Sequence, residues 1–191
     1  MAKKKNYVRV STPKGRLSFP NLLEPDFKYL SKTEKEYSAK ILIEKTQDVS
    51  KLQAAIEEAA KELDDPEGFN SPLVDGDTTK SEYENGYWVL RASSKVTEKS
   101  YPPKVVDHYK KDITDPSLVY SGCNARLGLS LGAYDVDARD GRNYGVKAYL
   151  NSALILPGGD PWAGGVDDLF EGLDLEEIAD EALAVDEETP F

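Results

Sequence analysis

The order of apolar and polar residues predicts a chain built mostly from β-strands. Strands with one buried face alternate between the two kinds of side chain, and four segments do so: 37–44, 87–95, 119–132 and 144–150. A further strand region covers residues 7–10 and resumes at 16–19, after a Pro-Lys-Gly break that indicates a turn or bulge. Together these segments predict five strands.

One segment has helical periodicity instead. An apolar stripe recurs every three or four residues, at Leu52, Ile56, Ala59, Ala60 and Leu63. Either Asp48 or Ser50 can cap the start of this helix, and the Asp-Asp-Pro run at 64–66 ends it. The polar stretch 66–86, which contains Gly and Pro, predicts a long surface excursion between the helix and the next strand.

These elements predict a mainly β protein with an OB-fold-like five-stranded barrel and an inserted helix. A sandwich usually needs about seven strands. The helix falls between the second and third predicted strands, whereas the simplest OB-fold has it between the third and fourth. Gly122, Gly128 and Gly132 share the polar face of segment 119–132 and would let that strand bend, as a small barrel requires.

The charge of the chain is unevenly distributed. It has 24 Lys and Arg against 35 Asp and Glu, a net charge of −11. Twelve of the acids lie in residues 160–191, which contain no Lys, Arg or His, so residues 1–159 carry 24 basic against 23 acidic side chains. We therefore expect one domain at 1–159 and a flexible acidic tail at 160–191. The tail ends in Phe191, an apolar group that solvation alone does not explain.

Several functional classes are disfavoured by what the sequence lacks. There is no apolar run of about eighteen residues, so we expect no membrane span, and the polar start is unlike a secretory signal. The single cysteine, Cys123, excludes an internal disulfide, which fits a cytoplasmic protein. The sole histidine, His108, has no second His or Cys nearby, and no nucleotide-binding or nucleophile motif is present. We expect no enzyme activity, no cofactor and no metal.

Basic residues gather beside tyrosines in the near-neutral body. Alternation places Arg91 and Lys95 on the same strand face as Tyr87, and cations with aromatic rings are what binding of single-stranded nucleic acid needs. The predicted DNA-binding residues are Lys14, Arg16, Lys40, Tyr87, Arg91, Lys95, Tyr101, Lys104, Arg126, Arg139, Arg142 and Tyr144.

The chain resembles the single-stranded DNA-binding proteins of tailed bacteriophages. The resemblance is carried by residues 37–45, 87–95 with Tyr101-Pro-Pro-Lys104, 120–131 and 144–150. The last six residues, Asp-Glu-Glu-Thr-Pro-Phe, are similar to the acidic tip of bacterial single-stranded DNA-binding proteins.

The resemblance implies a protein that coats and protects single-stranded DNA, without strong sequence preference, during phage replication, recombination and repair in the host cytoplasm. It implies that the tail competes with DNA for the basic groove and recruits partners such as a polymerase, helicase or nuclease. The tail residues that would do so are Asp186, Glu187, Glu188, Pro190 and Phe191.

Three alternatives remain open at this point. The first is an acidic interaction protein, such as a DNA mimic or an inhibitor of a host DNA-binding protein, although a near-neutral body argues against it. The second is a strand-annealing recombination protein. The third is a nuclease using Asp135 and Asp137 to bind Mg²⁺, but their position beside a hairpin loop favours solvated turn residues. The sequence also leaves self-association open.

Overall fold

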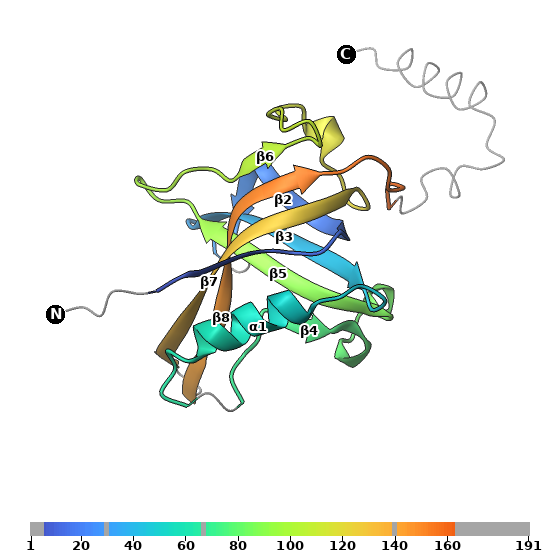
Figure 1. Cartoon of the computed structure of the whole chain (residues 1–191). Helices are drawn as coiled ribbons and strands as arrows, with labels where there is room; N and C mark the ends of the chain where they lie inside the picture. The colour runs from blue at the N-terminus through green and yellow to red at the C-terminus, as the bar shows by residue number, and fades with distance from the viewer. Residues whose placement is uncertain (1–5, 29–30, 66–67, 139–140, 163–191) are drawn as a thin grey trace, which may run out of the picture. The chain divides into compact units, whose positions relative to one another are not determined.

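The computed structural model describes residues 6–28, 31–65, 68–138 and 141–162. Within these ranges the chain forms eight β-strands and one α-helix (Figure 1). The strands are β1 (Val8–Ser11), β2 (Gly15–Phe27), β3 (Lys35–Glu44), β4 (Leu73–Asp75), β5 (Tyr87–Lys95), β6 (Lys104–Val106), β7 (Asn124–Ala138) and β8 (Gly141–Ile155). The helix is α1 (Ser50–Ala60), and three 3₁₀ turns are η1 (Gly76–Thr78), η2 (Glu82–Glu84) and η3 (Pro116–Leu118).

Five of these strands are long, and they correspond to the five predicted strand segments, so the mainly β, OB-fold-like prediction is confirmed. The bounds differ at several strand ends, and two of these differences have a clear structural cause. β2 continues to Phe27 because a register shift between Ser18 and Asn21 bends the strand without ending it. β7 begins at Asn124, later than predicted, because η3 and a turn at Gly122 (φ 104°) take up the preceding residues.

The strands form one curled sheet in the order β4-β5-β3-β2-β7-β8-β6, with β1 added alongside β7. β2 pairs with β7 through only two residue pairs, which include Gly15↔Ala125. No ladder joins β5 directly to β8 in the described ranges. Instead the Ser94 hydroxyl donates to the Leu150 carbonyl at 2.7 Å, and Asn70 forms a bridge with Gly145. The result is a partly open barrel, as an OB-fold is.

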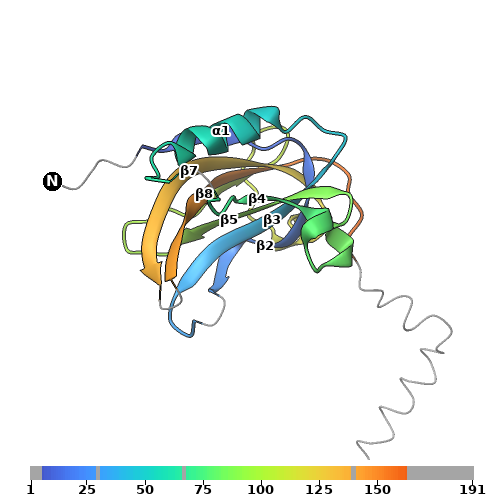
Figure 2. The same cartoon turned by 90° about the horizontal axis from the view of Figure 1, so that it is seen from below.

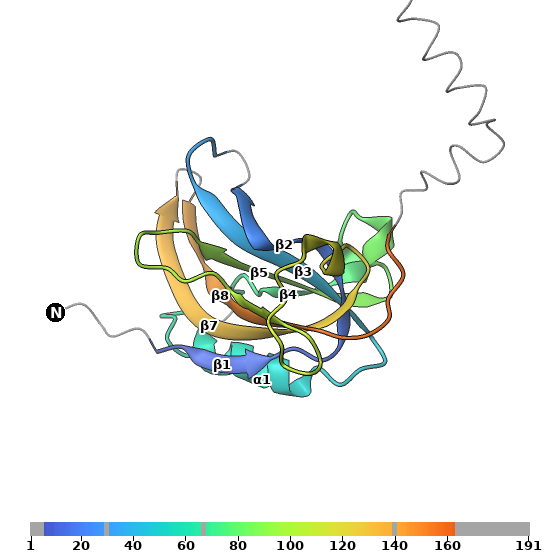
Figure 3. The same cartoon turned by 90° about the horizontal axis from the view of Figure 1, so that it is seen from above.

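The barrel interior is filled by the apolar side of each long strand. Leu17, Ile41, Leu90 and Leu127 are fully buried there. The helix closes one end of the barrel, on the side opposite the outer ends of the β2–β3 and β7–β8 hairpins (Figures 2 and 3). All five residues of the predicted helical stripe are buried. The Asp48 carboxylate accepts a 2.9 Å hydrogen bond from the Ser50 N–H at the helix start.

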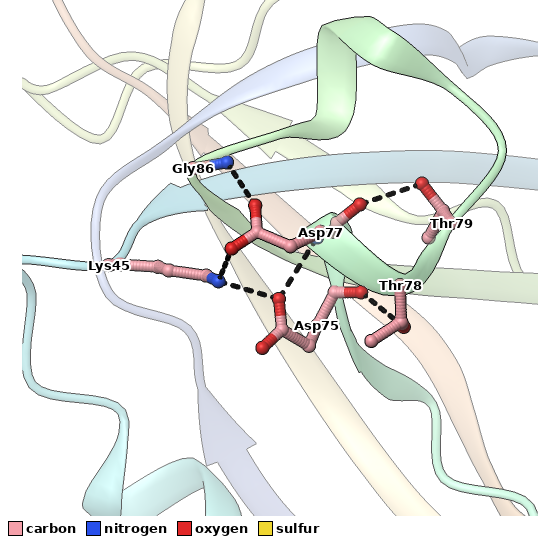
Figure 4. Close-up of polar contacts among 7 residues, drawn as sticks. Lys45, Asp75, Asp77, Thr78, Thr79 and Gly86 are labelled. Atoms are coloured by element: carbon pink, nitrogen blue, oxygen red, sulfur yellow. Dashed lines mark hydrogen bonds and ion pairs between the residues drawn. The ribbon is translucent and has the colours of Figure 1, made fainter.

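A salt-bridged cluster anchors the segment between α1 and β5 to the end of β3 (Figure 4). The Lys45 ammonium lies 2.6 Å from Asp75 Oδ1 and also binds Asp77. Asp77 in turn accepts the Gly86 N–H at 2.7 Å, which joins the start of η1 to the residue before β5. Gly76 permits this fold, because a Cβ there would lie 2.0 Å from the Glu84 carbonyl oxygen. The predicted surface excursion is therefore an ordered cover over part of the β3–β5 face.

The Lys45 cluster should make the stability of the fold depend on pH in the acidic range. Lys45 lowers the pKa of Asp75 and Asp77, chiefly through hydrogen bonds. These carboxylates therefore stabilise the fold above the unfolded pKa of about 3.9, and that contribution is lost as the pH falls through their lower folded-state values. We expect Lys45→Met to lower the urea midpoint at pH 6 and to lessen its decrease below about pH 4.

Urea unfolding followed by circular dichroism at pH 6, 4 and 3 measures this effect. Lys61→Met is the matched control, because Lys61 is an exposed lysine whose ion pair is with Glu58, three residues before it at the end of α1. If the urea midpoint of the Lys45 variant fell with pH as steeply as that of the unaltered chain, the Lys45 cluster would not be the source of the acid dependence.

Candidate nucleic-acid interface

The candidate interface is the outward side of β3 and β5. In an OB-fold the second and third strands, flanked by the loops after strands one and four, form the oligonucleotide-binding face. Counting the five long strands in order, these are β3 and β5, flanked by the β2–β3 and β7–β8 hairpins. Both hairpins extend from the same side of the barrel (Figures 2 and 3). The face therefore lies at the floor between two projecting walls.

Strand register brings three predicted DNA-binding residues together on this floor. Lys40 lies opposite Arg91, and Lys95 lies opposite Glu36, while Ser38 and Ser93 pair between them. We call the outward residues Glu36, Ser38, Lys40, Arg91, Ser93 and Lys95 the basic face. Arg91 and Lys95 are exposed, whereas the intervening Ala92 is buried in the core. Alternation along a strand with one buried side gave the correct orientation for all three cations.

A buried carboxylate holds one end of the basic face. Glu84 of η2 is fully buried, and its Oε1 lies 2.5 Å from the Lys40 ammonium and 3.8 Å from Arg91. Burial raises the pKa of Glu84, but the hydrogen bond from Lys40 and its other polar partners outweigh burial and leave the pKa below its usual value. Lys40 also donates to the Tyr83 hydroxyl at 2.6 Å. Lys40 is thus held within the fold by Glu84, while Arg91 remains 68% exposed.

Two lysines that the sequence reasoning missed lie beside Lys95. Lys28, directly after β2, is 3.7 Å from Glu34, and Lys95 binds the same carboxylate. Lys147 of β8 is half-buried. Burial lowers the pKa of Lys147, and the nearby charges of Lys28 and Lys95 lower it further, against the opposing effect of Glu36. Three ammonium groups from three separate strand segments thus gather at one end of the basic face.

Aromatic rings flank these cations. Phe27 ends β2 with 52% of its surface exposed, and Lys35 lies 5.0 Å from its ring centre. Tyr134 of β7 is half-exposed on the β7–β8 wall, where its hydroxyl donates to Asn143 at 3.3 Å. Sequence reasoning named neither residue. The signal for Tyr134 was present, because it shares the non-core side of β7 with Gly132 and Ser130.

Other predicted residues are distributed elsewhere on the barrel. Arg16 donates to the carbonyls of Gly122 (3.4 Å) and Asp160 (3.0 Å), so it holds the chain where it leaves the barrel. Lys104 on β6 lies 3.5 Å from Asp112. The other predicted residues outside the basic face are the exposed Tyr101, Arg126 and Lys14, together with the half-buried Tyr87 at the start of β5.

Arg142 and Tyr144 lie together, but on the opposite side of the β7–β8 hairpin from Tyr134 and Lys147. The Arg142 guanidinium binds both oxygens of Asp135, the closer at 2.5 Å, and lies 4.9 Å from the Tyr144 ring. This pairing raises the pKa of Arg142 and lowers that of Asp135. Arg139 and the tail residues Asp186, Glu187, Glu188, Pro190 and Phe191 lie outside the described residues.

The residues that the sequence raised as candidates for chemistry, His108, Cys123 and Asp135, lie within the described ranges. No group of three or more His, Cys, Asp or Glu side chains in these ranges could hold a metal ion. His108 lies against Tyr109, with ring centres 3.8 Å apart and ring planes tilted by 43°. Cys123 is buried, which raises the pKa of its thiol. Asp135 is ion-paired with Arg142. No helix in the described ranges is long and apolar enough to cross a membrane.

Comparison with solved structures identifies similar folds. The single-stranded DNA-binding protein of bacteriophage Enc34 in complex with ssDNA has a TM-score of 0.64 at 20% identity, over 85% of this chain and 97% of that one. A C-terminally truncated form of the same protein gives 0.65 at 20% identity, over 81% and 88%. Bacteriophage T7 gp2.5, also a single-stranded DNA-binding protein, gives 0.63 at 16% identity, over 89% and 97%.

A comparison with protein-family models shows which family the chain belongs to. A search of curated proteins finds no match. A family model described as Enterobacter phage Enc34, ssDNA-binding protein, matches residues 8–183, which is most of the sequence and the whole barrel. The chain therefore belongs to the phage single-stranded DNA-binding protein family represented by the Enc34 protein.

Proposed function

We propose that this protein coats and protects single-stranded DNA, without strong base preference, along the basic face between the two hairpins. The observation that carries the proposal is the gathering of Lys28, Arg91, Lys95 and Lys147 at one surface, beside Phe27 and Tyr134. Cations bind phosphates whatever the sequence, and aromatic rings stack on any base. The fold similarity to an Enc34 protein solved with ssDNA supports the same assignment.

Membership of the family supports a proposal about the biological setting. We propose that it acts in the host cytoplasm during phage DNA replication, recombination and repair, as a binding protein without a catalytic step. The charge distribution supports separate roles for the DNA-binding body and the tail, because residues 160–191 carry twelve acids and no basic residue. The acidic tail would compete with DNA for the basic face and offer Pro190 and Phe191 to a polymerase, helicase or nuclease.

The length of the tail is compatible with that competition. Asp160 is held beside Arg16, and an extended chain covers about 3.3 Å per residue, so the residues that follow could span about 100 Å. This reach exceeds the dimensions of a barrel of this size. Carboxylates spread along the tail can therefore occupy the sites that phosphates would take.

Substitutions on the basic face should weaken DNA binding. Arg91→Ala and Lys95→Ala each remove an exposed cation, so the log–log salt dependence of oligo-dT binding should become shallower by about 0.7 for each phosphate that is no longer neutralised. Fluorescence titration at several salt concentrations measures this slope. Lys61→Ala, on the helix side of the barrel, is the control and should leave it unchanged. If the unaltered protein did not bind oligo-dT at low salt, the proposed function would be wrong.

Glu84→Gln tests the internal competitor on the basic face. Removing the buried negative charge leaves Lys40 and Arg91 with fewer attractive contacts inside the protein, so oligo-dT should bind more tightly and with a steeper salt dependence. The same variant should unfold at a lower temperature, because Lys40 is deprived of its charged partner. Affinity equal to or weaker than that of the unaltered, folded protein would show that Glu84 does not oppose DNA.

Tail variants separate competition from recruitment. Truncation after Gly159 should tighten oligo-dT binding, most strongly at low salt, because the twelve acids are removed. Deletion of Phe191 alone should leave DNA affinity unchanged and weaken capture of replication proteins. Titration with oligo-dT and pull-down of a purified phage polymerase measure the two effects. Unchanged affinity after truncation would refute the competition.

A further inference from the structure

A groove of about 370 Å³ opens at the seam between β5 and β8, at the edge of the basic face. Its volume lies within the range of about 300–1,000 Å³ that small-molecule sites occupy. We call it the seam pocket. Its lining residues that matter here are Glu36, Ser71, Arg91, Ser93, Tyr134 and Lys147.

The seam pocket exists because the barrel is closed indirectly. β5 and β8 approach each other at Ser94 and Leu150, then separate, and residues 70–72 fill part of the gap. The Val146 N–H donates to the Asn70 carbonyl at 3.0 Å, and the Arg91 N–H donates to the Pro72 carbonyl at 3.2 Å. Gly145 allows this close approach, since a Cβ there would lie 2.3 Å from the Asn70 oxygen. The pocket thus has three walls of hydrogen-bonded backbone.

The side chains in the seam pocket match the parts of a nucleotide. Lys147 and Arg91 line the pocket together with one carboxylate, Glu36, and the Arg91 guanidinium also lies 3.8 Å from the buried Glu84. Lys147 has no ion-pair partner within 4 Å in the described ranges, although it is half-buried and close to the ring of Tyr149 at 5.3 Å. An amine that is partly removed from water and lacks a counterion gains most from an anionic ligand.

Groups for recognising a base are present as well. The Ser93 hydroxyl makes no hydrogen bond to any described residue and is half-exposed in the pocket, so it can donate to or accept from a base edge. Tyr134 supplies an aromatic wall. Neither group depends on one particular base, which agrees with sequence-tolerant binding.

We propose that the seam pocket holds one nucleotide of the bound strand, with its phosphate between Lys147 and Arg91 and its base against Tyr134, facing Ser93. This inference rests on the proposed function, because the ligand is a segment of the DNA that occupies the basic face. It adds an anchoring point at a defined position to a surface that binds the strand through cations and the exposed Phe27 ring. The bound DNA strand would then bend toward the seam pocket where it crosses between β5 and β8.

Photo-crosslinking locates the anchored base in the unaltered, full-length protein. An oligo-dT carrying 5-iododeoxyuridine is irradiated in the complex, and crosslinked peptides are identified by mass spectrometry. We expect a principal crosslink at Tyr134. Crosslinks confined to other aromatic residues, such as Phe27 or Tyr101, would overturn the proposal.

Binding measurements provide the second arm. Tyr134→Ala should weaken oligo-dT binding by about 5- to 150-fold, the loss expected for one stacked base. Lys147→Gln should make the salt slope shallower by about 0.7. The matched controls are Tyr109→Ala and Lys61→Gln, both at exposed positions away from the pocket, and thermal melting verifies that each variant is folded.

The outcomes distinguish the two proposals. If the unaltered protein fails to bind oligo-dT, the proposed function is wrong. If it binds normally while both pocket variants behave like their controls and Tyr134 is not crosslinked, the strand crosses the basic face without entering the seam pocket. A pocket variant that does not fold leaves the decision to the crosslink in the unaltered protein.

Discussion

The closure of the sheet between β5 and β8 is the constraint on which the candidate interface depends. The two strands do not form a continuous ladder over the described residues, so a serine hydroxyl at Ser94 and a bridge at Asn70 hold them together. This arrangement brings Lys147 of β8 to the same surface as Lys95 of β5 and Lys28 after β2. A fully paired seam would leave no room for the pocket beside Arg91, and a separated one would disperse the cations.

The basic face is balanced by carboxylates from the same domain. Glu84 binds Lys40 from within, and Glu34 binds both Lys28 and Lys95 at the edge. A protein that coats DNA, as we propose for this one, must also be displaced when the strand is copied. Internal acids reduce the attraction of the face for phosphate while keeping each cation in a defined position. The carboxylates therefore hold the cations of the basic face in defined positions and lower the net positive charge of this surface.

The sequence predicted the elements of the barrel better than the positions of the site residues. The sequence pattern identified all five long strands, and alternation oriented Lys40, Arg91 and Lys95 correctly, because a half-buried strand imposes a period of two. Lys28 and Lys147 were missed because their proximity to Lys95 arises only when the sheet curls. Arg142 and Tyr144 were included among the predicted DNA-binding residues because they lie near the hairpin loop in the sequence. The buried Val146 and Ala148 share the side of Tyr144, which was a readable signal that Lys147 faces the other way.

The contacts at the end of β8 have a consequence for the competition that we propose for the acidic segment. The Tyr120 hydroxyl donates to the Gly159 carbonyl at 2.9 Å, and Arg16 donates to that of Asp160, so the chain leaves the barrel from a fixed point. A tethered ligand acts at an effective concentration set by its length and attachment, often millimolar for short flexible links. Competition between tail and DNA within one molecule would thus be independent of protein concentration. Exchange of tails between neighbouring copies would instead disappear on dilution.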